Sequence, residues 1–268
     1  MARLPVKRFA EEEAGAEYFS ELGHNIDSGA SPVSSVWAIK PIGDLKVSGF
    51  FDRNDPKNES DMTMLESSVR HQISADEALQ RLIDGNARFI RGELHFPSVP
   101  QEVFADLAKG QRPYAMILGC SDSRVPPELV FGAGLGDLFV VRVAGNSISP
   151  EVAGSLQYAG VHLHTPLLVV LGHEGCGAIG AALETKFRGS RQHSRIQILV
   201  DGLLPALSQV DPNADPDAQI AQAVEANVRW TIAQILDTPE GQARLAEGRM
   251  KLVGAIYEIG TGRVRFLV

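Results

Sequence analysis

The stretch LLVVLGHEGCG at residues 167–177 decides the fold, because an apolar run is followed at once by glycines and metal-binding residue types. Continuous apolar runs such as 167–171 are typical of strands that are covered on both faces. A second run, 114–118, is followed in the same way by Gly119 and Cys120. Both favour an α/β fold with a central, mainly parallel β-sheet flanked by helices.

The remaining pattern alternates between strands and helices. The first helix of the domain is expected to begin after Ser74, because Glu77 completes a capping box, and Gly92 is a plausible stop. Apolar runs predict further strands at 138–143, 252–259 and 264–268. Helical spacing predicts helices at 101–109, 127–131, 150–162, 177–187, 195–208 and 216–236.

Residues 1–70 differ from the rest of the chain. They contain turn-rich and polar stretches, and no long periodic segment joins these stretches. We therefore expect a poorly structured N-terminal extension at 1–70. The α/β domain is expected at 71–268.

Composition limits the classes of partner. The chain has 268 residues and a net charge of −8, without a basic stripe, so a nucleic-acid partner is not expected. No apolar run has the length of a membrane span, and the N-terminus lacks the apolar region of a secretory signal. These features predict a cytoplasmic protein, in which the two cysteines stay reduced. The alternative, a Cys120–Cys176 disulfide, would leave His173, Asp122 and Arg124 without a role.

The two cysteine motifs indicate a metal site. Ligands collect outside the carboxyl ends of strands in an open parallel sheet, and Cys120 and His173 each follow such an end. Cys176 comes at the start of a predicted helix, where the helix dipole favours a thiolate. Two thiolates and an imidazole are a ligand set for zinc that leaves a fourth position open for catalysis.

Asp122 and Arg124 adjoin the first of these cysteines. If the segment stays extended, the side chains of Cys120, Asp122 and Arg124 leave on one face. Asp122 could then bind zinc or pair with Arg124, and these options exclude each other. A permanent Asp122 ligand would make the zinc purely structural.

Three motifs in this order resemble the β-class carbonic anhydrases: CSDSR at 120–124, VRVAGN at 141–146 and GHEGCGA at 172–178. The resemblance runs from about Ser74 to Val268, so we expect the domain at 71–268 to be a zinc-binding α/β catalytic domain. It implies one zinc ion (Zn²⁺) per chain, held by Cys120, His173 and Cys176, with Asp122 as a further ligand in a closed state. It also implies a catalytic Asp122–Arg124 dyad, and attack of zinc-bound hydroxide on carbon dioxide to give bicarbonate and a proton.

The same resemblance implies a substrate pocket and an assembly. Gln111 matches a glutamine that reaches the substrate across a dimer interface, so a homodimer or a dimer of dimers is expected. Phe139 and Tyr158 match apolar and aromatic pocket positions. Gly177 resembles a backbone donor near bound bicarbonate.

The chain departs from the family pattern at some positions. Val143 stands where asparagine is usual, and Gln157 stands where glutamate is common, so altered local hydrogen bonding or a weaker dimer contact is expected. Ile117 replaces the tryptophan of an allosteric, bicarbonate-inhibited subclass, which predicts the non-allosteric type. Two rival functions stay open: hydrolysis of carbon disulfide on the same scaffold, and a non-catalytic zinc-stabilised binding module. Gln111 and the Asp122–Arg124 pair argue against the second.

Overall fold

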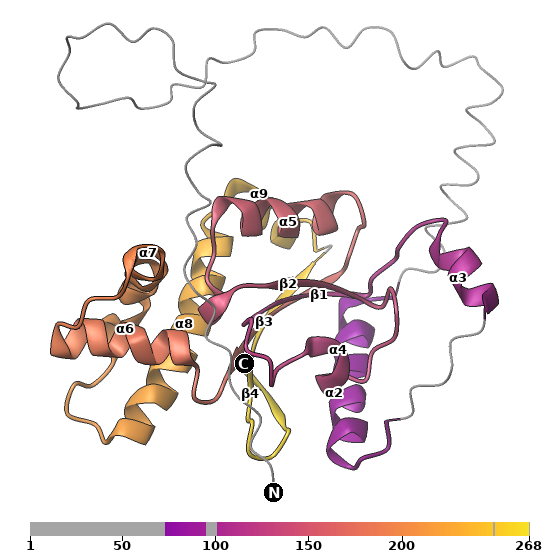
Figure 1. The fold of residues 1–268 in the computed structure, drawn as a ribbon. Helices are drawn as coiled ribbons and strands as arrows, with labels where there is room; N and C mark the ends of the chain where they lie inside the picture. Colours follow the sequence, from indigo (N-terminus) through magenta and orange to yellow (C-terminus); the bar gives the residue numbers. More distant parts are fainter. Residues whose placement is uncertain (1–72, 95–100, 249, 268) are drawn as a thin grey trace, which may run out of the picture. The chain divides into compact units, whose positions relative to one another are not determined.

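The computed structural model describes residues 73–94, 101–248 and 250–267 (Figure 1). The prediction of a poorly structured extension at 1–70 lies outside these residues. Within them, five strands form one sheet in the order β2-β1-β3-β4-β5. No helix among the described residues is both long and apolar enough to cross a membrane.

Four of the five strands are parallel. They are β1 (Ala115–Gly119), β2 (Leu138–Arg142), β3 (Leu167–His173) and β4 (Lys251–Tyr257), while β5 (Val264–Leu267) pairs antiparallel with β4. The predicted α/β fold with a mainly parallel sheet is confirmed. β1 and β3 lie at its centre and are buried throughout, as their continuous apolar runs predicted.

Helices cover both faces of the sheet (Figure 1). Alternate residues of the central strands point to opposite faces, so Met116 and Leu118 belong to one buried cluster and Ile117 to another. The first cluster packs against α5 (Pro150–Val161), α6 (Gly177–Arg188), α7 (Ser194–Leu203) and α8 (Pro216–Leu236). The second packs against α2 (Ala75–Ile90) and α4 (Pro127–Val130). We call these the α8 face and the α2 face.

Several helix ends follow from local chemistry. The Glu77 backbone N–H donates to Ser74 Oγ over 3.2 Å, and the Ser74 N–H donates to Glu77 Oε2 over 2.7 Å, which is the predicted capping box. α8 begins after Asp215, whose carboxylate accepts from the Ala218 N–H, and it has the predicted bounds. α3 (Gln101–Leu107) ends two residues before the predicted end.

One predicted helix is broken in the structure. We expected a single helix at 195–208, but α7 ends at Leu203 and a 3₁₀ helix, η2 (Leu204–Gln209), follows. Pro205 explains the break, because it has no N–H for an α-helical bond and its ring crowds the preceding turn. α9 (Pro239–Ala246) was not predicted, because this short segment carries no clear apolar periodicity.

Candidate active site

The sheet brings the three predicted ligands together. β1 and β3 are parallel neighbours with Gly119 paired to Leu171, so Cys120 and His173 leave the same edge of the sheet. Cys176 is the N-cap residue of α6, as predicted. The sulfur atoms of the two cysteines and one ring nitrogen of His173 lie within 4.8 Å of one another, and all three residues are buried.

The two cysteines are free thiols. Their Sγ atoms are 4.0 Å apart, about twice the length of a disulfide bond. The structure therefore contradicts the disulfide alternative.

The orientation of His173 fits a metal ligand. Its Nδ1–H donates to the Glu174 carbonyl over 2.9 Å, which leaves the lone pair on Nε2. Nε2 is buried and has no hydrogen-bond partner among the described residues. A buried polar atom without a partner is unfavourable, and a bound metal would satisfy it.

The contact between the two thiols shifts their pKa values in opposite directions. Hydrogen bonding from Cys176 lowers the pKa of Cys120, whereas the hydrogen bond to Cys120 and burial raise the pKa of Cys176. The N–H groups of Ile179 and Ala178 act on Cys176 in the predicted direction, towards the thiolate, but they are outweighed. A divalent cation would allow both thiols to ionise, so the donor set fits zinc.

Asp122 and Arg124 form a two-pronged ion pair beside this cluster. Arg124 Nε donates to Asp122 Oδ1 over 2.9 Å, and Arg124 Nη2 donates to Oδ2 over 2.7 Å. These bonds hold the pKa of Asp122 well below its usual range. Asp122 Oδ2 is 3.9 Å from His173 Nε2, so the carboxylate adjoins the cluster but is paired with Arg124.

The backbone that carries Asp122 and Arg124 is not extended, unlike the segment that we considered from the sequence. The Val125 N–H donates to the Asp122 carbonyl over 3.1 Å, and the Arg124 N–H donates to Asp122 Oδ1 over 2.9 Å. The chain therefore turns directly after Asp122. A short aspartate side chain favours such a turn, because it can accept from the backbone two residues later.

Arg142 is a positioning residue that the sequence analysis missed. It ends β2, and its Nε donates to the Cys120 carbonyl over 2.9 Å while its Nη2 donates to the Asp122 carbonyl over 2.5 Å. The available signal was an arginine at the end of an otherwise apolar strand. Arg142 ties the loop that carries Cys120 and Asp122 to the neighbouring strand.

The backbone of Gly145 was missed as well. Its N–H donates to Cys120 Sγ over 3.3 Å from η1 (Ala144–Asn146). Gly145 has a φ of +69°, and an added Cβ would lie 3.1 Å from Leu203 and 3.2 Å from Ala178. Glycine is therefore required here for both conformation and space.

The residues predicted to bind substrate are spread over the chain. Gly177 begins α6 beside Cys176. Gln111 precedes β1, whereas Cys120 follows it, and the strand between them spans about 16 Å. Phe139 lies three positions before the end of β2, and its ring centroid is 6.3 Å from that of Tyr158. One chain thus brings Gly177 to the cluster, but it leaves Gln111, Phe139 and Tyr158 nearer the opposite edge of the sheet.

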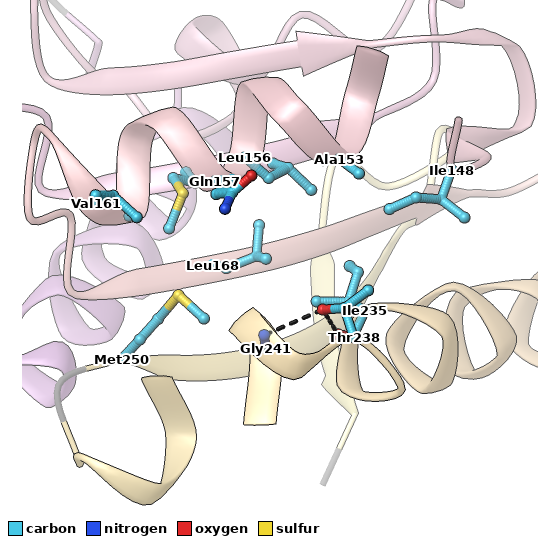
Figure 2. Close-up of a pocket in the computed structure, with 12 residues that line it drawn as sticks. Ile148, Ala153, Leu156, Gln157, Val161, Leu168, Ile235, Thr238, Gly241 and Met250 are labelled. Carbon is cyan, nitrogen blue, oxygen red and sulfur yellow. Dashed lines mark hydrogen bonds between the residues drawn. The ribbon is translucent and has the colours of Figure 1, made fainter. Parts of the chain in front are cut away.

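An apolar pocket lies away from the cluster, between α5, β3 and the segment from α8 to α9 (Figure 2). Leu168, near the amino end of β3, forms part of its wall, and Gln157 also lines it. The Thr238 hydroxyl is bonded to the Ile235 carbonyl and the Gly241 N–H. The lining holds no titratable group, so this pocket is not the predicted site.

Comparison with known proteins decides the family. The sequence profile described as carbonic anhydrase matches residues 115–264, and the similar solved structures are β-class enzymes. This chain belongs to the β-carbonic anhydrase family. Members of this family are lyases, so the chain is assigned to an enzyme family.

Two relatives with similar sequences and one with a similar structure support this assignment. The carbonic anhydrase of Mycolicibacterium smegmatis is 40% identical over 196 residues, which covers 70% of this chain and 90% of that protein. Carbonic anhydrase 2 of Mycobacterium tuberculosis is 37% identical over 187 residues, covering 69% and 89%. A tetrameric β-carbonic anhydrase of Sordaria macrospora is 26% identical with a TM-score of 0.58, covering 71% and 97%.

Proposed function

We propose that this chain catalyses the reversible hydration of carbon dioxide to bicarbonate and a proton, with one zinc ion per chain held by Cys120, His173 and Cys176. The observation that carries the proposal is the pairing of Asp122 with Arg124 beside three buried donors. A purely structural zinc would take Asp122 as its fourth ligand. The pairing with Arg124 instead leaves the zinc a position for chemistry.

Each residue of the site then has a role. Zinc, when bound, supplies Lewis acidity that lowers the pKa of a water molecule enough to make it a nucleophile. Asp122 accepts a hydrogen bond from the attacking water and orients it towards carbon dioxide. Arg124 keeps Asp122 ionised, and the backbone N–H of Gly177, at the start of α6, donates to the bicarbonate product.

The substrate pocket is proposed to be completed by a partner chain. Within one chain, Gln111 precedes β1, Phe139 lies near the start of β2 and Tyr158 lies on α5, so all three are away from the cluster at the other ends of the strands. Tyr158 is also exposed, with 48% of its surface accessible. A homodimer or a dimer of dimers would bring these residues to the neighbouring site, and a reducing compartment such as the cytoplasm would keep both thiols available.

Stopped-flow hydration of carbon dioxide tests the proposal on purified full-length protein with its zinc content measured. We expect about one zinc per chain and a rate that disappears in His173→Ala, whereas the exposed His193→Ala variant keeps it. Carbon disulfide serves as a second substrate. A zinc-loaded protein that hydrolyses carbon disulfide but does not hydrate carbon dioxide, or that does neither, would refute the proposal.

A further inference from the structure

We infer that Asn227 and Thr231 of α8 are positioning residues for the metal centre, because they hold the turn whose N–H donates to Cys120 Sγ. This inference rests on the proposed zinc site. It gives α8 a role in the metal centre, although this helix contributes none of the three proposed ligands. The two residues act on the centre through the backbone of Gly145 and Asn146.

A continuous set of buried hydrogen bonds connects α8 to the sulfur. Asn227 Nδ2 donates to the Gly145 carbonyl over 2.8 Å, and Thr231 Oγ1 donates to the Asn146 carbonyl over 3.3 Å. On the other side of the same turn, the Gly145 N–H donates to Cys120 Sγ over 3.3 Å. Asn227 and Thr231 are four residues apart, so they lie on one face of α8 and reach consecutive carbonyls.

The turn needs such support because of its backbone conformation. Gly145 has a φ of +69° and Asn146 a φ of +41°, so two consecutive residues are left-handed. This region is unfavourable for a residue with a side chain, and surrounding contacts must maintain it. The side chains of α8 supply these contacts, since they occupy both carbonyls.

The contact with sulfur gives the turn its chemical effect. A hydrogen bond to a ligand thiolate stabilises its negative charge and fixes the direction of its lone pairs. Second-sphere groups of this kind raise metal affinity and set the charge that the ligand gives to the metal. A shift of the turn would weaken this bond even if all three ligands stayed in place.

Asn86 shows what a purely structural buried asparagine does in this fold. Its Nδ2 donates to the Val130 and Gly262 carbonyls, and its Oδ1 accepts from the Val264 N–H. Asn227 is as deeply buried, yet its Oδ1 has no partner within the described part of the chain. A half-satisfied buried amide is a poor choice for stability alone, so its bond to Gly145 needs another explanation.

Matched substitutions separate positioning from stability. Asn227→Leu and Asn86→Leu make the same change at two buried sites, one connected to the site and one not. Thr231→Val removes the second α8 donor and keeps its shape, and Thr231→Ser restores the hydroxyl. Two readouts are measured on each full-length protein: the zinc dissociation constant by competition with a chromophoric chelator, and the thiolate-to-metal charge-transfer band after substitution with Co²⁺.

We expect Asn227→Leu to weaken zinc binding about tenfold and to shift the Co²⁺ band, and Thr231→Val to act in the same direction by a smaller factor. Thr231→Ser and Asn86→Leu should keep the wild-type zinc affinity and band, although Asn86→Leu loses stability. If Asn227→Leu does not fold, the two Thr231 variants decide. The inference fails if Thr231→Val leaves both readouts unchanged, or if Asn86→Leu alters them equally. A wild-type protein that binds no zinc would instead refute the proposed function.

Discussion

The two faces of the sheet differ in how fully their buried polar groups are hydrogen-bonded. On the α2 face, Asn86 forms three hydrogen bonds that join α2 to α4, to the turn before β5 and to the first residue of β5. On the α8 face and at the adjoining sheet edge, buried atoms of His173, Asn146 and Asn227 lack partners among the described residues. Unsatisfied polar atoms are rare in folded proteins. Six side-chain atoms of this kind occur among the described residues, and three of them belong to His173, Asn146 and Asn227, while the others belong to Thr165, Thr185 and Trp230. Asn86 on the α2 face thus serves stability, whereas Asn227 on the α8 face keeps an unsatisfied atom next to the turn that contacts Cys120.

The largest effect is expected from removal of a ligand. Cys176→Ala leaves one thiol and an imidazole, which is too small a set to hold zinc tightly. Zinc content and carbon dioxide hydration should both fall to background, as measured by metal analysis and stopped flow. A Cys176→Ala protein that keeps tight zinc would contradict the ligand assignment.

Removal of Arg124 tests the pairing at the edge of the cluster. Arg124→Ala frees Asp122, which can then turn towards the metal, so we expect activity near neutral pH to fall about 100-fold with zinc retained. Arg191→Ala, an arginine in an exposed loop away from the site, is the control. Wild-type activity in Arg124→Ala would show that the pair is not needed.

Removal of Asn86 tests the other face. Asn86→Ala leaves buried carbonyl and N–H groups without partners, so the free energy of unfolding should fall by about 2–3 kcal/mol. Urea denaturation of the zinc-loaded protein measures this loss. Zinc stoichiometry should not change. A loss of zinc under native conditions would show that Asn86 also supports the metal site, which would contradict the comparison of the two faces.

The smallest effect concerns Tyr114, which packs on the α2 face. Burial, with a contribution from Asp137, raises the pKa of Tyr114 from 10.0 to about 12. The raised pKa favours the neutral phenol in the folded state, so its contribution to stability is complete below pH 10 and is lost as the pH rises towards 12. Denaturation curves across this range should show a smaller alkaline loss for Tyr114→Phe than for the wild type. Equal losses in the two proteins would contradict this.

Local signals were enough to predict the sheet, the helix start after Ser74, the bounds of α8 and the three clustered donors. Each of these depends on residues close in sequence or on the rule that parallel strands end at one edge. The contact between Asn227 and Gly145 could not be predicted, because it joins residues 82 positions apart through packing. The break at Pro205 was visible in the sequence, but the apolar spacing around it favoured an unbroken helix.

Zinc K-edge X-ray absorption on the purified, zinc-loaded protein tests the central claim most directly, because it counts sulfur and nitrogen ligands. We predict two sulfur atoms at about 2.3 Å and one imidazole nitrogen at about 2.0 Å, with a light atom completing the shell. In His173→Ala the imidazole signal should disappear, while His193→Ala should leave the spectrum unchanged. A shell without two sulfur atoms, or an imidazole signal that persists in His173→Ala, would contradict the account.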